Sequence, residues 1–99
     1  MVVLTAHYVT RPEDTDAILT DLATMTELVR MHEPGCAEYR VLRRVDQPHE
    51  LLLYEAYQDQ AALEAHSATA YFQEIVLGRI VPRLISRERT LWTVAGDPV

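Results

Sequence analysis

Residues 51–57 are LLLYEAY, and this stretch decides the fold that the sequence predicts. Successive side chains of a β-strand point to opposite faces, so the odd-numbered positions share one face and the even-numbered positions share the other. An antiparallel strand with one face in water normally alternates apolar and polar residues. Residues 51–54 are apolar throughout, so we expect both faces of this strand to be covered.

Two further strands and a helix are predicted before this stretch. Residues 2–9 are rich in β-branched side chains and are followed by Pro12, which indicates a first strand. Acidic residues after Pro12 and an apolar stripe at helical spacing predict a helix that continues to His32. The Pro34-Gly35 pair ends that helix. A second strand from about 37 to 44 then leads through a turn at 46–49 into residues 51–57.

The remaining chain predicts two helical segments and a last strand. Asp59 is a good N-cap for a short helix that runs through His66. Residues 67–69 interrupt it, and Thr69 caps a second helical segment that Pro82 ends. Residues 86–94 alternate charge and bulk and finish in an apolar run, which favours a fourth strand.

The order β-α-β-β-α-β over residues 1–99 predicts a single α+β domain. This order is the ferredoxin-like, split βαβ arrangement, in which both helices lie on one face of a four-stranded antiparallel sheet. Two helices cover only one face, although residues 51–57 are apolar on both. A second copy of the chain is the economical cover, so we expect a homodimer with two sheets face to face, a dimeric α+β barrel.

Charge and cysteine content restrict the partners and the compartment. The net charge is −6, which argues against nucleic acid and anionic membrane as partners, because both need a basic face. Cys36 stands alone and fits a reducing compartment. The first residues resemble a strand rather than a signal peptide, and no apolar run is long enough for a bilayer. We therefore expect a soluble cytoplasmic protein.

The sequence lacks the usual motifs for metals, nucleotides and acyl transfer. The four histidines are scattered, and no HxH, CxxC or HExxH spacing occurs. There is no GxGxxG, no P-loop and no GxSxG. We expect no metal and no other cofactor.

Several loose motifs together resemble one known family. They are Glu33-Pro34-Gly35-Cys36, Tyr39, Leu53-Tyr54-Glu55-Ala56-Tyr57 with Asp59, Ala61-Ala62-Leu63, His66, Phe72, residues 76–82 and residues 87–90. The sequence is similar to the antibiotic biosynthesis monooxygenase (ABM) family, and most of all to its quinol monooxygenase branch. The resemblance implies a dimeric barrel that oxidises quinol-like or polycyclic phenols with O2, without metal or flavin.

Such an enzyme needs a dry aromatic pocket, a base that makes the phenolate, and donors for the oxygen anion that develops. The resemblance places the pocket between sheet and helices, on the face of Leu53, Glu55 and Tyr57. A carboxylate on that buried face needs a partner, and the nearest candidates are His66 and His7. A Glu–His contact fixes the histidine tautomer and provides a base or proton shuttle.

The predicted site therefore has three catalytic candidates and five substrate-binding ones. The catalytic candidates are His66, Glu55 and His7, and the substrate-binding candidates are Tyr57, Leu53, Tyr71, Phe72 and Arg79. Glu55 has a structural alternative, a hydrogen bond or an ion pair with an arginine, and His7 has one as a satisfied core histidine. Val76 replaces the histidine that ligates heme in the heme-degrading branch, so no heme is expected.

Two other functions stay open at this point. Tyr54-Glu55-Ala56-Tyr57, Asp59 and His66 also resemble the branch that processes the phosphorylated autoinducer-2 signal. That resemblance implies proton transfer on a small hydroxyketone without O2, and Arg79 is the obvious residue for the phosphate. The third possibility is a non-catalytic, small-molecule-binding dimer, because this fold carries many functions.

Overall fold

The computed structural model describes residues 1–97. Its elements are β1 (Val2–Thr10), η1 (Pro12–Asp14), α1 (Thr15–His32), β2 (Cys36–Arg43), β3 (Glu50–Tyr57), α2 (Gln60–Ala68), η2 (Phe72–Ile80), η3 (Val81–Arg83) and β4 (Leu84–Thr93). The predicted order is confirmed. The main difference lies in η2, which is a π-helix, and β4 begins two residues earlier than expected.

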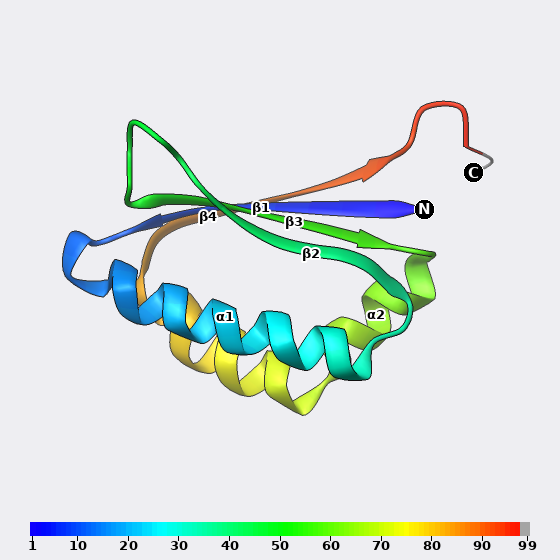
Figure 1. The fold of residues 1–99 in the computed structure, drawn as a ribbon, viewed down its shortest axis with the longest axis horizontal. Helices are drawn as coiled ribbons and strands as arrows, with labels where there is room; N and C mark the ends of the chain where they lie inside the picture. Colours follow the sequence, from blue (N-terminus) through cyan, green and yellow to red (C-terminus); the bar gives the residue numbers. More distant parts are fainter. Residues whose placement is uncertain (98–99) are drawn as a thin grey trace.

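The four strands form one antiparallel sheet in the order β2-β3-β1-β4. This order confirms the ferredoxin-like fold. Figure 1 shows the sheet as one layer, with α1, α2 and the helical segment after α2 in a second layer on a single face. The two central strands, β1 and β3, therefore lie beneath the helices and carry most of the inward-facing side chains.

The core forms between α1 and the inward faces of these central strands. In the register of the sheet, Leu4 pairs with Glu55 and Ala6 pairs with Leu53, so all four share the helix-facing side. Leu53, Glu55 and Tyr57 are all buried, which confirms the face predicted for them. The helix contributes an apolar stripe at helical spacing, made of Ile18, Leu22, Met25 and Val29.

The other face of the sheet has no helix over it (Figure 1). Leu42, Leu52 and Trp92 are 42%, 36% and 53% exposed there, so a single chain leaves large apolar side chains open to solvent. Trp92 lies along the sheet and donates from Nε1 to Thr5 Oγ1 at 2.9 Å. None of the helices in residues 1–97 combines the length and the apolar character needed to cross a membrane.

The π-helix η2 follows α2 directly and lies against the sheet. Its wide turns appear in the hydrogen bond from the Val81 N–H to the Val76 carbonyl, five residues earlier. Phe72 and Val76 on this segment are buried. π-Helical turns are rare and are found frequently at functional sites.

A close approach at Gly35 holds α2 against the end of α1. A Cβ atom at Gly35 would lie only 2.8 Å from the Ala62 Cβ, so any larger residue forces the two segments apart. The Gln58 N–H also donates to the Gly35 carbonyl at 2.9 Å. Gly35 therefore fixes the distance between the turn after α1 and the first turns of α2.

We expect Gly35→Ala to destabilise the chain by about 1–3 kcal/mol, because overpacking a tight contact costs that order. Gly78→Ala is the matched control, since Gly78 is exposed and a Cβ there would meet only the Gln73 carbonyl, at 3.4 Å. That control should be neutral or stabilise by up to about 1 kcal/mol. Urea denaturation measures both, and equal stability of the two variants would contradict this account of Gly35.

Candidate active site

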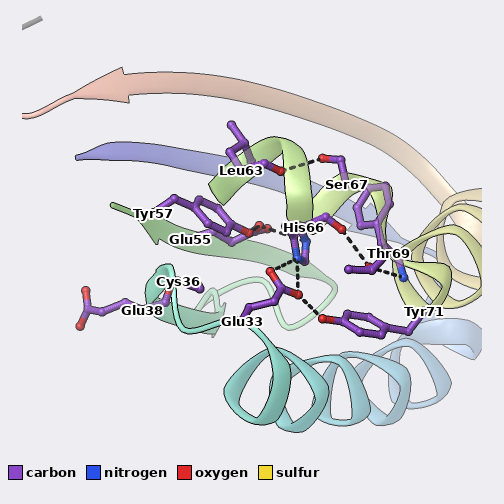
Figure 2. Close-up of polar contacts among 11 residues, drawn as sticks. Glu33, Cys36, Glu38, Glu55, Tyr57, Leu63, His66, Ser67, Thr69 and Tyr71 are labelled. Carbon is purple, nitrogen blue, oxygen red and sulfur yellow. Dashed lines mark hydrogen bonds and ion pairs between the residues drawn. The ribbon is translucent and has the colours of Figure 1, made fainter. Parts of the chain in front are cut away.

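His66 stands at the centre of a buried polar cluster, shown in Figure 2. It lies in the last turn of α2, a short helix that begins where Asp59 Oδ1 accepts from the Ala62 N–H at 2.9 Å. The residue is 1% exposed. Thr69 closes the helix by donating its hydroxyl to the His66 carbonyl at 2.9 Å. Capping at both ends thus fixes the position of the imidazole.

Glu33 is one of two carboxylates beside this imidazole. It is the C-cap residue of α1, and its Oε1 and Oε2 lie 2.9 and 3.0 Å from His66 Nδ1. An ionised carboxylate only accepts, so this contact assigns the proton to Nδ1 and leaves Nε2 of the neutral ring as the free nitrogen. Tyr71 donates its hydroxyl to Glu33 Oε2 from the other side.

Glu55 is the second carboxylate and faces the free nitrogen. Its Oε1 lies 3.6 Å from His66 Nε2 and accepts a hydrogen bond from the Tyr57 hydroxyl at 2.6 Å. Burial raises the pKa of Glu55, and the Tyr57 hydrogen bond, the protonated form of His66 and the charge of Arg89 oppose that rise. Burial and the neighbouring Glu55 also raise the pKa of Tyr57, which therefore stays a phenol that donates. Glu55 thus has the raised proton affinity that a general base needs.

Aromatic side chains surround the imidazole. The ring centroids of Tyr39, Tyr57 and Phe72 lie 5.8, 5.6 and 5.2 Å from that of His66. Burial raises the pKa of Tyr39 as well, so it remains neutral. The pair of His66 and Glu55 is therefore in a dry aromatic setting, where electrostatic interactions are stronger than in water.

A small cavity borders Glu55 between the sheet and η2. Its volume is about 10 Å³, about the space of one water molecule. Leu53, Glu55, Phe72, Arg87 and Arg89 are among the residues that line it. The Arg87 Nε atom is buried and has no hydrogen-bond partner within residues 1–97, and the charge of Arg89 acts on Glu55. The cavity therefore combines a carboxylate with two guanidinium groups.

The structure brings most of the predicted site residues together. Glu55, Tyr57, His66 and Phe72 are in mutual contact through the hydrogen bonds and ring contacts above, and Leu53 lines the cavity. Tyr71, a predicted substrate-binding residue, does not line the cavity, because its hydroxyl donates to Glu33 on the Nδ1 side of His66.

Two predicted residues lie elsewhere. His7 projects from the opposite face of β1, where its Nε2 lies 2.9 Å from Glu50 Oε1 and its side chain is 40% exposed. The alternation of the strand explains this correction, since Ala6 and Tyr8 turn inward and His7 turns out. Arg79 is not at the cavity either, because its guanidinium pairs with Asp21 Oδ1 of α1 at 3.2 Å.

The sequence analysis missed Glu33, Arg87 and Arg89. Glu33 belongs to the break after α1 and to the Glu33-Pro34-Gly35-Cys36 motif, but no local pattern connects it with His66, 33 residues away. The arginines did carry a signal, because residues two apart on a strand share a face. Their register against Tyr8 and Ala6 of β1 turns them toward the helices.

The geometry around His66 does not suggest a metal site. Among the described residues, no group of three or more His, Cys, Asp or Glu side chains is arranged to hold a metal ion. The contacts of His66 instead suit proton transfer, with one nitrogen bonded to a carboxylate and the other facing a second. The absence of a cofactor stays a prediction.

Comparison with known proteins identifies relatives over most of the chain. A family model described as antibiotic biosynthesis monooxygenase matches residues 1–76. The Bacillus subtilis (strain 168) protein YcnE, whose name assigns it provisionally to the monooxygenases, is 30% identical over 76 residues, 77% of this chain and 79% of YcnE. A crystal structure of an antibiotic biosynthesis monooxygenase has a TM-score of 0.87 at 26% identity and covers 95% of this chain and 98% of that one. Rv0793 from Mycobacterium tuberculosis, at 23% identity, has a TM-score of 0.86 over 99% of this chain and 98% of its own, which shows the fold alone.

Glu55→Gln is expected to remove a pH dependence of stability. Burial raises the pKa of Glu55, so the folded chain holds this proton more tightly than the unfolded chain. The stability of the wild type relative to the variant is therefore greatest below about pH 4 and falls as pH rises through the folded pKa, by up to about 1.4 kcal/mol per unit. Urea denaturation of both proteins across this range measures the difference, and a difference independent of pH would contradict the raised pKa.

Proposed function

This chain belongs to the antibiotic biosynthesis monooxygenase family, and we propose that it is a cofactor-independent monooxygenase that oxidises a small quinol or phenol with O2. One observation carries the proposal. Glu55 is 3% exposed, borders the cavity, accepts from Tyr57, and faces the free nitrogen of His66. This is a buried base beside an aromatic pocket, which is the part that cofactor-free oxidation of a phenol requires from the protein.

The first step is deprotonation of the substrate. The phenolic O–H proton passes to Glu55, whose pKa burial has raised toward that of a phenol. His66 Nε2, 3.6 Å from Glu55 Oε1, is placed to share this proton. The phenolate is a better electron donor to O2 than the phenol, so this transfer starts the oxidation. General-base catalysis of this kind contributes about 10²–10⁴-fold in rate.

The second step uses O2 as the oxidant. A ring carbon of the phenolate forms the new C–O bond, and the peroxide oxygen carries negative charge. Loss of the hydrogen on that carbon and cleavage of the O–O bond leave one oxygen as the carbonyl of a quinone and the other as water. Arg87 and Arg89 line the cavity, and their positive charges suit the oxygen anion that develops.

The substrate needs more room than the closed cavity provides, because a volume of about 10 Å³ does not hold a phenol ring. Phe72 and Val76 of η2 form the helix-side wall. We propose that η2 moves aside to admit the substrate. We assign the movement to η2 because π-helical segments are rare and are found frequently at functional sites.

The working unit that we propose is a homodimer. Leu42, Leu52 and Trp92 leave the outer face of the sheet apolar and open in one chain. Two such faces packed together would bury these side chains and form a dimeric α+β barrel. The cavity beside Glu55 lies on the opposite, helix-covered side, so each chain would hold its own site.

Proton transfer on a small phosphorylated hydroxyketone is the second candidate function. The observation that favours it is the pair Arg87 and Arg89 at the cavity, which supplies the positive charge that Arg79 does not. Glu55 and His66 would then move a proton between neighbouring carbons, and no O2 would be consumed. A non-catalytic binding dimer would use the same cavity without turnover.

O2 consumption with a panel of small quinols and phenols tests the monooxygenase. We expect uptake by the wild type, and losses of about 10²–10⁴-fold in Glu55→Gln and His66→Ala, because each removes part of the base. Glu27→Gln is the matched control, since Glu27 on α1 is 65% exposed and, within residues 1–97, has its ion pair with Arg30 alone.

The outcomes separate the candidates, provided that each variant is first shown to be folded. Uptake by the wild type that both variants match would contradict the site. A wild type inert toward the whole panel would contradict the monooxygenase and favour the isomerase or the binding dimer.

Light scattering tests the proposed homodimer. At micromolar protein concentration it should give twice the chain mass of 11.3 kDa. Leu52→Asp should lose the dimer, as monomer or as insoluble chain, because an unpaired carboxylate in an apolar interface costs several kcal/mol. Val45→Asp is the matched control, because Val45 is fully exposed in the turn between β2 and β3. A wild-type chain that remains a stable monomer would contradict the dimer.

A further inference from the structure

The carboxylate of Glu33 has a defined place on the outer side of His66. Both of its oxygens lie within 3.0 Å of Nδ1, whereas Glu55 lies on the Nε2 side at 3.6 Å. Figure 2 shows His66 between the two carboxylates, with Tyr71 bonded to the far side of Glu33. Glu33 does not border the cavity beside Glu55, so its contact with the site is made through the imidazole.

The surroundings of Glu33 keep this carboxylate in place. It is the C-cap of α1, where its backbone N–H donates to the Val29 carbonyl at 2.9 Å. Its side chain is only 10% exposed and receives donors from both His66 and Tyr71. Burial and the Glu33 carboxylate raise the pKa of Tyr71, which therefore stays a donor. The carboxylate has little freedom to turn away from Nδ1.

We infer that Glu33 is the positioning residue of the active site, which holds His66 as the Nδ1–H tautomer and stabilises the imidazolium formed when Nε2 takes a proton. The inference rests on the proposed function and deepens it. A carboxylate bonded to the far nitrogen orients an imidazole and stabilises its charged form without itself taking the proton. In this arrangement His66 accepts the substrate proton and holds it while O2 reacts.

The proton balance closes within the site. The phenolic proton passes to a Glu55 oxygen and then to His66 Nε2, which leaves Glu55 as a carboxylate and His66 as an imidazolium between two negative charges. When the O–O bond breaks, Nε2 returns the phenolic proton through Glu55 to the departing oxygen. The hydrogen lost from the ring carbon follows as a second proton through the same carboxylate, so the oxygen leaves as water. His66 is then neutral again with its proton on Nδ1, and Glu33 has stayed ionised throughout.

The test compares Glu33→Gln with Glu33→Asp and with the surface control Glu27→Gln. Gln keeps the size of the side chain but loses the charge, and its amide presents both a donor and an acceptor to Nδ1. Asp keeps the charge on a shorter side chain. In protein labelled with ¹⁵N-histidine, we expect the wild type and Glu27→Gln to show the His66 Nδ1–H form, with a downfield, slowly exchanging proton.

Glu33→Gln should give a mixture of the two His66 tautomers, and the Nδ1 proton of Glu33→Asp should move upfield and exchange faster. With an active quinol, kcat of Glu33→Gln should fall about 10²-fold with little change in KM, and Glu33→Asp should recover part of that loss. A role in folding alone would lower the amount of active protein without changing the tautomer.

Unchanged His66 resonances in Glu33→Gln would overturn the inference. If that variant does not fold, an unchanged Nδ1 proton in Glu33→Asp would overturn it equally. The resonances are read without substrate, so they decide the positioning role even if the wild type consumes no O2. Failure of the proposed function and failure of this inference are therefore separate results.

Discussion

A carboxylate buried near the end of β3 organises the elements that surround the candidate site. Glu55 is 3% exposed on the helix-facing side of the sheet, where an unpartnered charge would cost several kcal/mol. The Tyr57 hydroxyl donates to it at 2.6 Å and the charge of Arg89 stabilises it, while His66 lies beside it at 3.6 Å and is held by Glu33. These residues come from β3, α2 and the end of α1, so the buried carboxylate ties together the three elements around the site.

The local structure around these elements gives the cluster its precision. Gly35 permits the turn after α1 to contact Ala62 of α2, and the caps at Asp59 and Thr69 fix the ends of that short helix. Glu33 and His66 are far apart in sequence, but they are brought within 2.9 Å by this packing. A site built on capped and closely packed segments is more precise than one on a free loop.

The two faces of the sheet have separate roles in the functions proposed above. The helix-covered face holds the proton-transfer cluster and a cavity that is almost closed, with the π-helix η2 as its wall. The outer face holds exposed apolar side chains and no part of the cluster. His7 and Glu50 pair on that face, away from Glu55. The proposed dimer contact and the proposed catalysis therefore use different residues.

The sequence was enough to predict the element order, the sheet and the face of β3 that holds Leu53, Glu55 and Tyr57, because periodicity and capping are local signals. It also selected Glu55 and His66, since a carboxylate on a buried face needs a partner. It misplaced His7 and Arg79 and missed Glu33, Arg87 and Arg89. The positions of these residues depend on long-range packing. The strand register sets which side of the sheet His7 and Arg87 occupy, and the packing of α2 on the end of α1 sets which carboxylate reaches Nδ1.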